Sequence, residues 1–249
     1  MMATDIVNVS PSIGKIAVEE RLNGDDKQCC IGAGTCGGID AGTRFNPELI
    51  DAGLKDKISE TLDISPQDRV IGFCGRICRE KGIEELIDGF GLLKNRREGE
   101  SLKLLLVGPY DERDVLSEPA RKRIESDPSI VMTGYVKENL QYYYSLMDVF
   151  VLPSYREGFG MSVIEASSME VPVIVSKVHG CVDSIVEGMT GEFVDISAEA
   201  ICDRLDGFLS DPDVARYGKA GRKDVLAKYD HHVIWPEILS FYRTLADRT

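Results

Sequence analysis

Short apolar runs and helical apolar spacing alternate along the chain from residue 70 onward. The runs are rich in β-branched and large apolar residues, which suit strands buried on both faces of a sheet. Between the runs, apolar positions recur every three or four residues, as in Ile83, Leu86 and Phe90, and this spacing is typical of helices. The six runs lie at residues 70–74, 104–107, 130–132, 148–152, 171–175 and 192–194. The pattern predicts an α/β fold: a Rossmann-like, parallel, six-stranded sheet with helices on both faces.

Helical spacing continues after the last run and predicts a helical C-terminal tail. Residues 198–209 and 213–228 carry mixed apolar spacing, and a charged helix is also expected earlier, from about residue 112 to 125. The last predicted helix carries an apolar stripe of Trp235, Ile238, Leu239, Tyr242 and Leu245. The stripe fits two interpretations: packing on the sheet, or contact with a partner that this chain does not encode.

Two further short strands are predicted at residues 5–9 and 28–31, with a helix between them. Ser10 suits the N-cap of that helix and Pro11 its first position. One helix and two strands are too few to form a domain of their own.

A glycine-rich segment follows, in which Gly32, Gly34 and Gly37 match the GxGxxG dinucleotide-binding fingerprint. The fingerprint requires a helix directly after it, because the pyrophosphate sits on the N-terminus of that helix. Residues 39–47 have no helical apolar period and contain another glycine. We therefore interpret the segment as a flexible loop and not as an NAD site.

The stretch 153–166 carries the clearest functional pattern of the chain. It follows a buried strand, and Gly158 and Gly160 allow a tight turn before apolar spacing marks a new helix from Met161. A strand, a glycine turn and a helix start leave backbone N–H groups free to face an anion. The local pattern predicts a phosphate-binding turn.

Two glutamates bracket this turn. Glu157 lies within it and Glu165 on the second turn of the helix, with seven residues between them. Carboxylates are poor phosphate ligands, so we expect them to accept hydrogen bonds from hydroxyl groups. A ligand that carries both phosphates and sugar hydroxyls fits both features, whereas the alternative is a surface turn with two solvated acids.

The same stretch resembles the signature of family 4 glycosyltransferases of the GT-B fold, in which two glutamates flank a Gly-Phe-Gly turn. The resemblance implies that Glu157, as the catalytic residue, faces the donor sugar and that Glu165 faces the nucleotide ribose. It also implies donor binding by the consecutive residues Gly158, Phe159, Gly160, Met161 and Ser162.

Basic residues follow the first strand of the predicted sheet, where open parallel sheets bind their ligands. Arg76 and Lys81 would stabilise the charge of a diphosphate leaving group, and their spacing matches the family's diphosphate-binding pair. The alternative is two solvated cations in an ordinary loop. We add Gly75, and also Tyr135 after the third strand, whose backbone would contact the base. His179, after the fifth strand, is either near the donor sugar or an ordinary loop residue.

Composition narrows the classes of partner. The net charge of -13 argues against nucleic-acid binding and against a basic membrane-binding patch. Seven cysteines without a paired CxxC pattern, and only three histidines, indicate free thiols and no metal site. No segment resembles a signal peptide, and no apolar run approaches the ~20 residues of a membrane span. We expect a soluble, cytoplasmic protein, and leave open a peripheral position on the inner membrane face.

The resemblance covers nearly the whole chain and implies two parts. Residues 1–48 correspond to a remnant of an N-terminal domain and the interdomain linker, and residues 49–249 to a Rossmann-like nucleotide-sugar donor-binding domain. The implied enzyme is a retaining glycosyltransferase of hexosyltransferase type without metal or cofactor. It transfers a sugar from a UDP- or GDP-linked donor to a glycan or lipid-linked acceptor in the assembly of a bacterial surface polysaccharide.

Most of the N-terminal domain of that family has no counterpart in this sequence, so we expect poor transfer by the isolated chain. Two alternatives stay open. One is a non-catalytic nucleotide-sugar-binding subunit that needs a separate N-terminal GT-B half as its partner. The other is a GT-B-like sugar-nucleotide epimerase, which would turn over its substrate without an acceptor.

Overall fold

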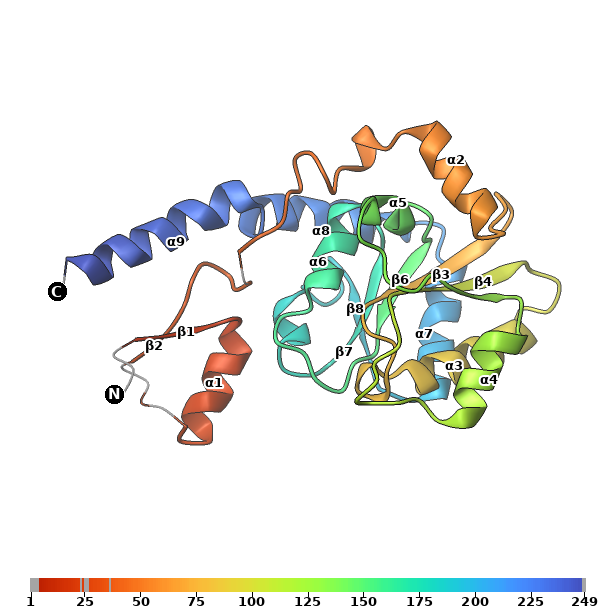
Figure 1. Ribbon diagram of the computed structural model, residues 1–249, viewed down its shortest axis with the longest axis horizontal. Coiled ribbons are helices and arrows are strands. Elements are labelled where there is room, and N and C mark those ends of the chain that lie inside the picture. The colour runs from red at the N-terminus through yellow and green to blue at the C-terminus, as the bar shows by residue number, and fades with distance from the viewer. Residues whose placement is uncertain (1–4, 23, 25–26, 36, 248–249) are drawn as a thin grey trace.

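A computed structural model describes residues 5–247 of the chain, except 23, 25–26 and 36. Its centre is a six-stranded sheet with the strand order β5-β4-β3-β6-β7-β8, in which all neighbouring strands are parallel (Figure 1). The strands are β3 Arg69–Cys74, β4 Leu102–Val107, β5 Ile130–Met132, β6 Val149–Leu152, β7 Val173–Ser176 and β8 Glu192–Val194. The predicted fold class is confirmed, and each strand overlaps its predicted run.

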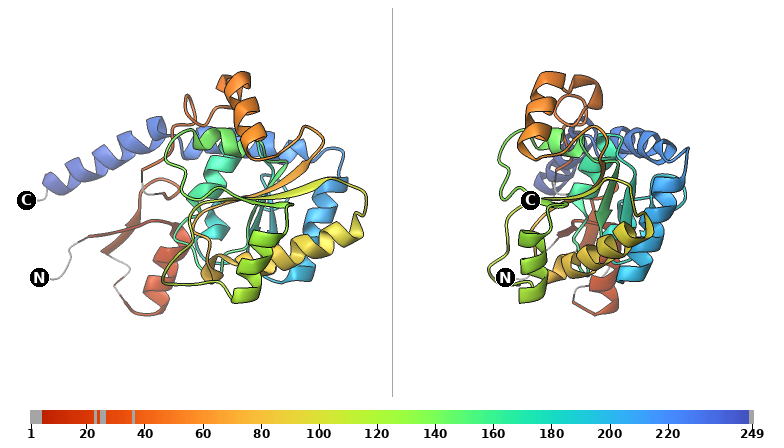
Figure 2. Two further views of the ribbon diagram at one scale, coloured as in Figure 1. Left: turned by 45° about the vertical axis from the view of Figure 1, so that its right-hand side comes forward. Right: turned by 90° about the vertical axis from the view of Figure 1, so that its right-hand side faces the viewer.

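Helices cover both faces of this sheet. The α-helices that follow the linker are α2 Ala52–Thr61, α3 Ile83–Arg96, α4 Glu118–Ser126, α5 Leu140–Tyr144, α6 Met161–Ser168, α7 Ala198–Ser210, α8 Ala215–Lys228 and α9 His231–Ala246. Helix α3 packs against α7 and α4, whereas α6 packs against α8 and α5, and the two groups lie on opposite sides of the sheet (Figure 2). Every residue of β6 is buried between them, as its uninterrupted apolar sequence predicts.

The strand order creates a switch point between β3 and β6. From β3 the sheet continues through β4 and β5 on one side, and from β6 through β7 and β8 on the other. The loops that follow β3 and β6 therefore diverge, and open parallel sheets bind ligands in the crevice that this leaves at the carboxyl ends of the strands. These two loops begin at Gly75 and Pro153, so the crevice lies beside the residues that the sequence singles out.

Two helices differ from the predicted pattern. Helix α4 begins at Glu118 and not near residue 112, because the Asp111 carboxylate accepts the backbone N–H of Arg113 at 2.8 Å and holds a turn there. Helix α2 has no predicted counterpart, since it buries no residue and its apolar spacing is correspondingly weak. Its clearest signal is the N-cap Asp51, which accepts the N–H of Leu54.

The N-terminal segment forms a small unit of its own. Strands β1 Ile6–Asn8 and β2 Gln28–Cys30 pair in parallel and are joined by α1 Pro11–Glu19. As predicted, Ser10 caps α1 by accepting the N–H of Ile13. Helix α1 contacts the short 3-10 turn η4 Cys181–Asp183, which follows β7. The small unit therefore sits against the edge of the large sheet where the loops converge.

The linker between the two units has no helix after its glycines in the part that the structure describes. Residues 37–46 form a bridge and turns, and Ile39 pairs with Asp230 at the start of α9. Phe45 is buried in the core of the large unit. This geometry agrees with the interpretation of the GxGxxG match as a loop, because a dinucleotide site needs the helix that is missing here.

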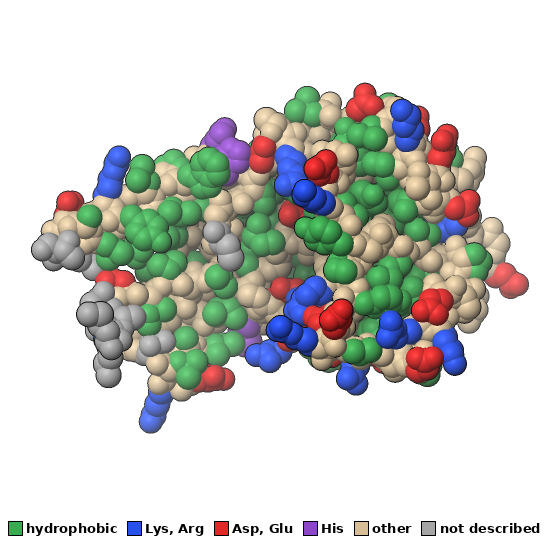
Figure 3. Space-filling view, in the orientation of Figure 1, with side chains coloured by type: hydrophobic (Ala, Val, Ile, Leu, Met, Phe, Trp, Pro, Cys, Tyr) green, Lys and Arg blue, Asp and Glu red, His purple; other side chains and the backbone are tan. Residues whose placement is uncertain are grey.

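Helix α9 extends well past the sheet toward one end of the molecule (Figure 1). Its residues Trp235, Leu239 and Tyr242 are 58%, 50% and 61% exposed, and Figure 3 shows apolar side chains gathered over this end. Packing on the sheet therefore does not account for these three side chains, and contact with a partner stays a prediction. None of the helices in the described residues combines the length and hydropathy needed to cross a membrane.

Candidate functional site

Two close backbone approaches bring three loops together at the switch point. Gly82 has φ +67°, and a Cβ atom there would lie 2.1 Å from the carbonyl oxygen of Pro153. Gly180 has φ +84°, and a Cβ atom there would lie 2.4 Å from the carbonyl oxygen of Glu157. Only glycine fits either position. The loops that follow β3, β6 and β7 therefore touch, and their side chains share one crevice.

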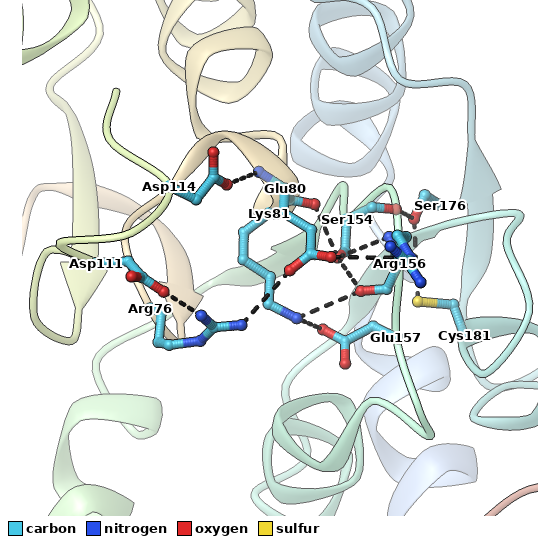
Figure 4. A network of polar contacts seen from close by, with 10 residues as sticks. All are labelled: Arg76, Glu80, Lys81, Asp111, Asp114, Ser154, Arg156, Glu157, Ser176 and Cys181. Atoms are coloured by element: carbon cyan, nitrogen blue, oxygen red, sulfur yellow. Dashed lines mark hydrogen bonds and ion pairs between the residues drawn. The ribbon is translucent and has the colours of Figure 1, made fainter. Parts of the chain in front are cut away.

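Lys81 and Glu157 form a shielded ion pair in this crevice. The Lys81 Nζ lies 2.5 Å from Glu157 Oε1 and 3.4 Å from the carbonyl oxygen of Arg156 (Figure 4). The two side chains are 13% and 15% exposed, and charges at this depth need a partner. The lysine predicted to bind the diphosphate and the glutamate predicted to be catalytic are thus neighbours, and in this structure each neutralises the other.

Arg76 lies in the same loop as Lys81 and is held by two acids. Its guanidinium pairs with Asp111 and lies 3.5 Å from the carboxylate of Glu80 (Figure 4). Partial burial opposes its charged form, but the hydrogen bond and the charge of Asp111 raise the pKa of Arg76. Sequence reasoning missed Asp111, which directly follows Tyr110 in the loop after β4. Asp111 could have been predicted, because residues that follow neighbouring parallel strands lie together at one edge of the sheet.

A cavity of about 900 Å³ opens beside these residues. Its lining includes the four cations Arg76, Lys81, Arg156 and Lys177 and the three acids Glu20, Glu80 and Glu157. His179, for which the sequence left two interpretations, lines the cavity as well. Figure 3 shows Lys and Arg side chains gathered near the middle of one face, with acidic side chains among them. The excess of cations here contrasts with the net charge of -13 for the whole chain, so the cavity suits an anionic ligand.

Helix α1 supplies another part of the cavity lining, with Ile13 and Ile16. Ser12 fixes the helix in place. Its hydroxyl donates to Asp183 Oδ2 at 2.5 Å and accepts the N–H of Gly180 at 2.7 Å. Sequence reasoning did not bring α1 to the site, because apolar spacing shows that a helix has a buried face but does not show where that face docks.

Glu165 lies on α6, outside the lining of this cavity. Its Oε2 accepts a hydrogen bond from the Tyr144 hydroxyl at 2.7 Å. Burial raises the pKa of Glu165, while the bond from Tyr144 and the charge of Arg44 act against that rise. Burial also raises the pKa of the Cys74 thiol to about 12, and the charge of Glu165 adds to it. The carboxylate therefore lies near the end of β3, at the edge of the sheet where the Gly75 loop begins.

The rest of the signature turn joins the core to the start of α6. The side chain of Phe159 is buried and packs on Tyr229, with ring centroids 5.2 Å apart, so only its backbone can face a ligand. Gly160, with φ +77°, caps α6 without a side-chain hydrogen bond. Met161 and Ser162 open the first turn, where backbone N–H groups have no intrahelical acceptor.

The remaining predicted residues also lie at this edge of the sheet. Gly158 lines the cavity. Gly75 touches the loop after β4, since a Cβ atom on Gly108 would lie 1.9 Å from the Gly75 carbonyl oxygen. Gly108 pairs in turn with Gly134, and Tyr135 follows with 76% of its surface exposed. The donor-binding roles of these residues stay predictions.

Cys181 could serve as a nucleophile and Asp230 as a metal ligand, but the first is buried and the second is bonded within the fold. Burial raises the pKa of Cys181, next to Glu157, to about 12. One group of potential metal ligands occurs in the part of the chain that the structure describes: Asp230, His231 and His232. The Asp230 carboxylate caps α9 and accepts the N–H of Ala41 at 3.1 Å, so it serves as an anchor between the linker and α9.

Comparison with known proteins gives a family match. The family described as Glycosyl transferases group 1 matches residues 55–224. The capsular polysaccharide biosynthesis glycosyltransferase CapM of Staphylococcus aureus is 33% identical over 245 residues, which cover 97% of this chain and 62% of that relative. The chain spans 52% and 51% of two further curated relatives. It therefore corresponds to between about half and three fifths of the length of these proteins.

Solved structures share the fold. The C-terminal domain of LpcC, a glycosyl transferase group 1 family protein of Francisella tularensis, matches with a TM-score of 0.65 and 24% identity, over 78% of this chain and 99% of that domain. Anabaena HepE in complex with UDP-glucose matches with a TM-score of 0.82 and 17% identity, over 98% of this chain and 64% of HepE. The resemblance stated from the signature residues is confirmed. This chain belongs to the glycosyl transferases group 1 family and carries its C-terminal GT-B domain.

Proposed function

We propose that this chain is the donor-binding half of a retaining hexosyltransferase, which transfers a sugar from a UDP- or GDP-linked donor to a glycan or lipid-linked acceptor. The name of the relative CapM supports a role in the assembly of a surface polysaccharide. The observation that carries the proposal is the cluster of Arg76, Lys81 and Glu157 at the switch point of the sheet, next to the loop that leads into α6.

Arg76 and Lys81 bind the diphosphate in this proposal. Both are paired with carboxylates, Asp111 and Glu157, so a diphosphate exchanges one anion for another and leaves no shielded cation without a partner. The backbone N–H groups at the start of α6 add donors that face an anion. Negative charge grows on the diphosphate as the glycosidic bond breaks, and fixed donors stabilise it more than bulk water does.

The two glutamates bind the hydroxyl groups on either side of the diphosphate. Glu157, once Lys81 has turned to the phosphates, accepts hydrogen bonds from the donor sugar. Glu165 accepts hydrogen bonds from the ribose, near the end of β3. Gly75 and Tyr135 contact the base in this proposal.

A relative in complex supports the class of ligand. Anabaena HepE, which shares the fold, is described with UDP-glucose. At 17% identity the likeness extends to the fold alone, so experiments on this chain need both uracil and guanine nucleotides.

We also propose the division of the chain into residues 1–48, which belong to an N-terminal domain and its linker, and residues 49–249, the donor-binding domain. A two-stranded sheet such as β1-β2 is marginally stable by itself. It lies at the same end of the molecule as the exposed stripe of α9 (Figures 1 and 2). A second GT-B half would extend this small sheet and cover Trp235, Leu239 and Tyr242.

Calorimetry of the 249-residue chain with UDP and GDP tests the proposal. We expect the wild type to bind at least one of them. Arg76→Ala combined with Lys81→Ala should lower the affinity by about 100-fold or more, because each charged contact contributes about 1.5–3 kcal/mol. The control combines Arg216→Ala with Lys228→Ala, which removes equal charge from two ion pairs outside the crevice. Failure of the wild type to bind, or equal affinities in the two double variants, contradicts the proposal.

The exposed stripe on α9 favours a second candidate, a nucleotide-sugar-binding subunit that works only with a separate N-terminal half. Mixing the chain with the separately produced part of CapM that it does not match tests it. Transfer of sugar to an acceptor in the mixture, but not by the chain alone, would support the subunit. Equal transfer with and without the added domain would contradict it.

A further inference from the structure

Tyr144, the last residue of α5, is enclosed by aromatic rings and donates its hydroxyl to Glu165. The side chain is 0% exposed. Its ring meets Phe45 edge-on with centroids 6.1 Å apart and lies 5.9 Å from the ring of Phe150. The hydroxyl oxygen is 2.7 Å from Glu165 Oε2. Because the core holds the ring on both sides, the direction of this hydroxyl is fixed.

Glu165 is surrounded by few groups that could hold it. The titratable and charged groups that face it are Tyr144 from α5, the Cys74 thiol from β3 and the guanidinium of Arg44 from the linker. Within the described part of the chain, Tyr144 is the one residue that donates a hydrogen bond to the Glu165 carboxylate, and it donates to Oε2. The other carboxylate oxygen, Oε1, is left to meet a ligand.

We infer that Tyr144 is a positioning residue for nucleotide binding: its hydroxyl fixes one oxygen of Glu165, so that the other oxygen meets the ribose hydroxyls. The inference rests on the proposed function, in which Glu165 binds the ribose. A free glutamate side chain loses rotamer entropy when it is ordered on binding. The bond from Tyr144 orders Glu165 before the nucleotide arrives, whereas a tyrosine that only fills the core could be phenylalanine without loss.

Two nucleotides that differ only in the ribose hydroxyls measure the ribose contact separately from the diphosphate contact. The experiment measures the affinities of the full chain for UDP and for 2′,3′-dideoxy-UDP, and for the GDP pair if guanine is preferred. The wild type should favour the ribose form by about 10-fold to 100-fold, since hydrogen bonds to a charged group are involved. In Tyr144→Phe this ratio should fall by about 10-fold, while the affinity for the dideoxy form is unchanged.

Tyr142→Phe is the matched control. Tyr142 is buried in the same helix, and its hydroxyl accepts the N–H of Asp51 at 3.4 Å, away from Glu165. Its removal should leave the ratio at the wild-type value. If Tyr144→Phe weakens both nucleotides equally, Tyr144 is structural and the inference is overturned. A wild type that binds UDP and dideoxy-UDP equally overturns it as well, while diphosphate binding survives. Failure to bind any of these nucleotides overturns the proposed function itself.

The pH profile of the ratio is a second readout. A ribose contact that needs the carboxylate is present above the pKa of Glu165 and is lost as the pH falls through it. The bond from Tyr144 favours the ionised form, so its loss raises that pKa and the ratio should begin to fall at a higher pH. Both nucleotides carry the diphosphate, so its titration changes both affinities equally and does not change their ratio. Identical pH profiles for the wild type and Tyr144→Phe overturn the inference.

A measurement on the wild type replaces the variant if Tyr144→Phe does not fold. The chain is labelled with ¹³C at the tyrosine ζ-carbons and titrated with UDP and dideoxy-UDP. The signal of a tyrosine coupled to the ribose site should shift with UDP and not with the dideoxy form. Identical shifts with both nucleotides overturn the inference.

Discussion

Replacing Glu157 by glutamine is expected to tighten the binding of UDP or GDP while it weakens the fold. The Glu157 carboxylate lies 2.5 Å from the Nζ of Lys81, so it competes with a diphosphate for this cation. Glutamine keeps the size of the side chain and removes the charge. Lys81→Met removes the cation instead, and should lose nucleotide affinity. If the carboxylate and the diphosphate compete for Lys81, Glu157→Gln and Lys81→Met should change the nucleotide affinity in opposite directions.

The magnitudes follow from the burial of the pair. Breaking an exposed pair costs about 0.2–1 kcal/mol, and breaking a buried one costs about 3–5 kcal/mol. At 13% and 15% exposure the pair lies between these limits, so each single variant should lose about 2 kcal/mol of unfolding free energy. The double variant should lose about as much as either single one. Removal of the competing carboxylate should raise UDP affinity about tenfold, equivalent to ~1.4 kcal/mol.

Urea unfolding followed by circular dichroism gives the stability part of this cycle, and calorimetry with UDP and GDP gives the affinity part. UDP and GDP carry no donor sugar, so the lost contact between Glu157 and that sugar does not enter the result. Competition between the Glu157 carboxylate and the diphosphate is refuted if Glu157→Gln weakens nucleotide binding as much as Lys81→Met does. It is also refuted if the two stability losses add in the double variant, because independent residues add and paired ones do not.

Three further predictions concern the scaffold. Gly82→Ala should lower the unfolding free energy by about 2–4 kcal/mol in urea titrations, because its Cβ would meet a backbone carbonyl at positive φ. The control is Gly207→Ala in α7, where a Cβ meets no atom within 4 Å. This variant should raise the unfolding free energy by no more than ~1 kcal/mol. Ser12→Ala should make the N-terminal unit cleave faster in limited proteolysis; an unchanged rate would show that the bond to Asp183 does not hold it. Burial opposes the charged form of Asp127, but bonds from Ser129 and Lys94 lower its pKa, so its contribution is present above pH ~4 and lost below it. Asp127→Asn should therefore flatten the fall in the urea midpoint between pH 5 and 3, and an equal slope in the wild type and variant would be evidence against this.

The strands and the glycine turn were predictable because each depends on local sequence. An uninterrupted apolar run such as Val149–Leu152 suits only a position covered on both faces. Gly82 and Gly180 mark places where another backbone must approach closely. Their partners, Pro153 and Glu157, lie far away in the sequence, and only the sheet order brings them together.

The pairing of charges was not predictable. The pattern after β3 indicated two cations ready for a diphosphate, but Arg76 is held by Asp111 and Lys81 by Glu157. Such pairs depend on side-chain directions across separate loops, which residue spacing does not encode. The docking of α1 through Ser12 and the bond from Tyr144 to Glu165 are contacts of the same kind.

In the proposed function, the ion pair of Lys81 and Glu157 opens to admit a nucleotide diphosphate. A crystal structure of the chain grown with UDP, or with GDP if calorimetry favours it, tests this most directly. If the pair opens, diphosphate oxygens lie within hydrogen-bond distance of Arg76 and Lys81, and the Glu157 carboxylate is turned away from Lys81. A nucleotide bound elsewhere, or one bound beside an intact pair of Lys81 and Glu157, would contradict it.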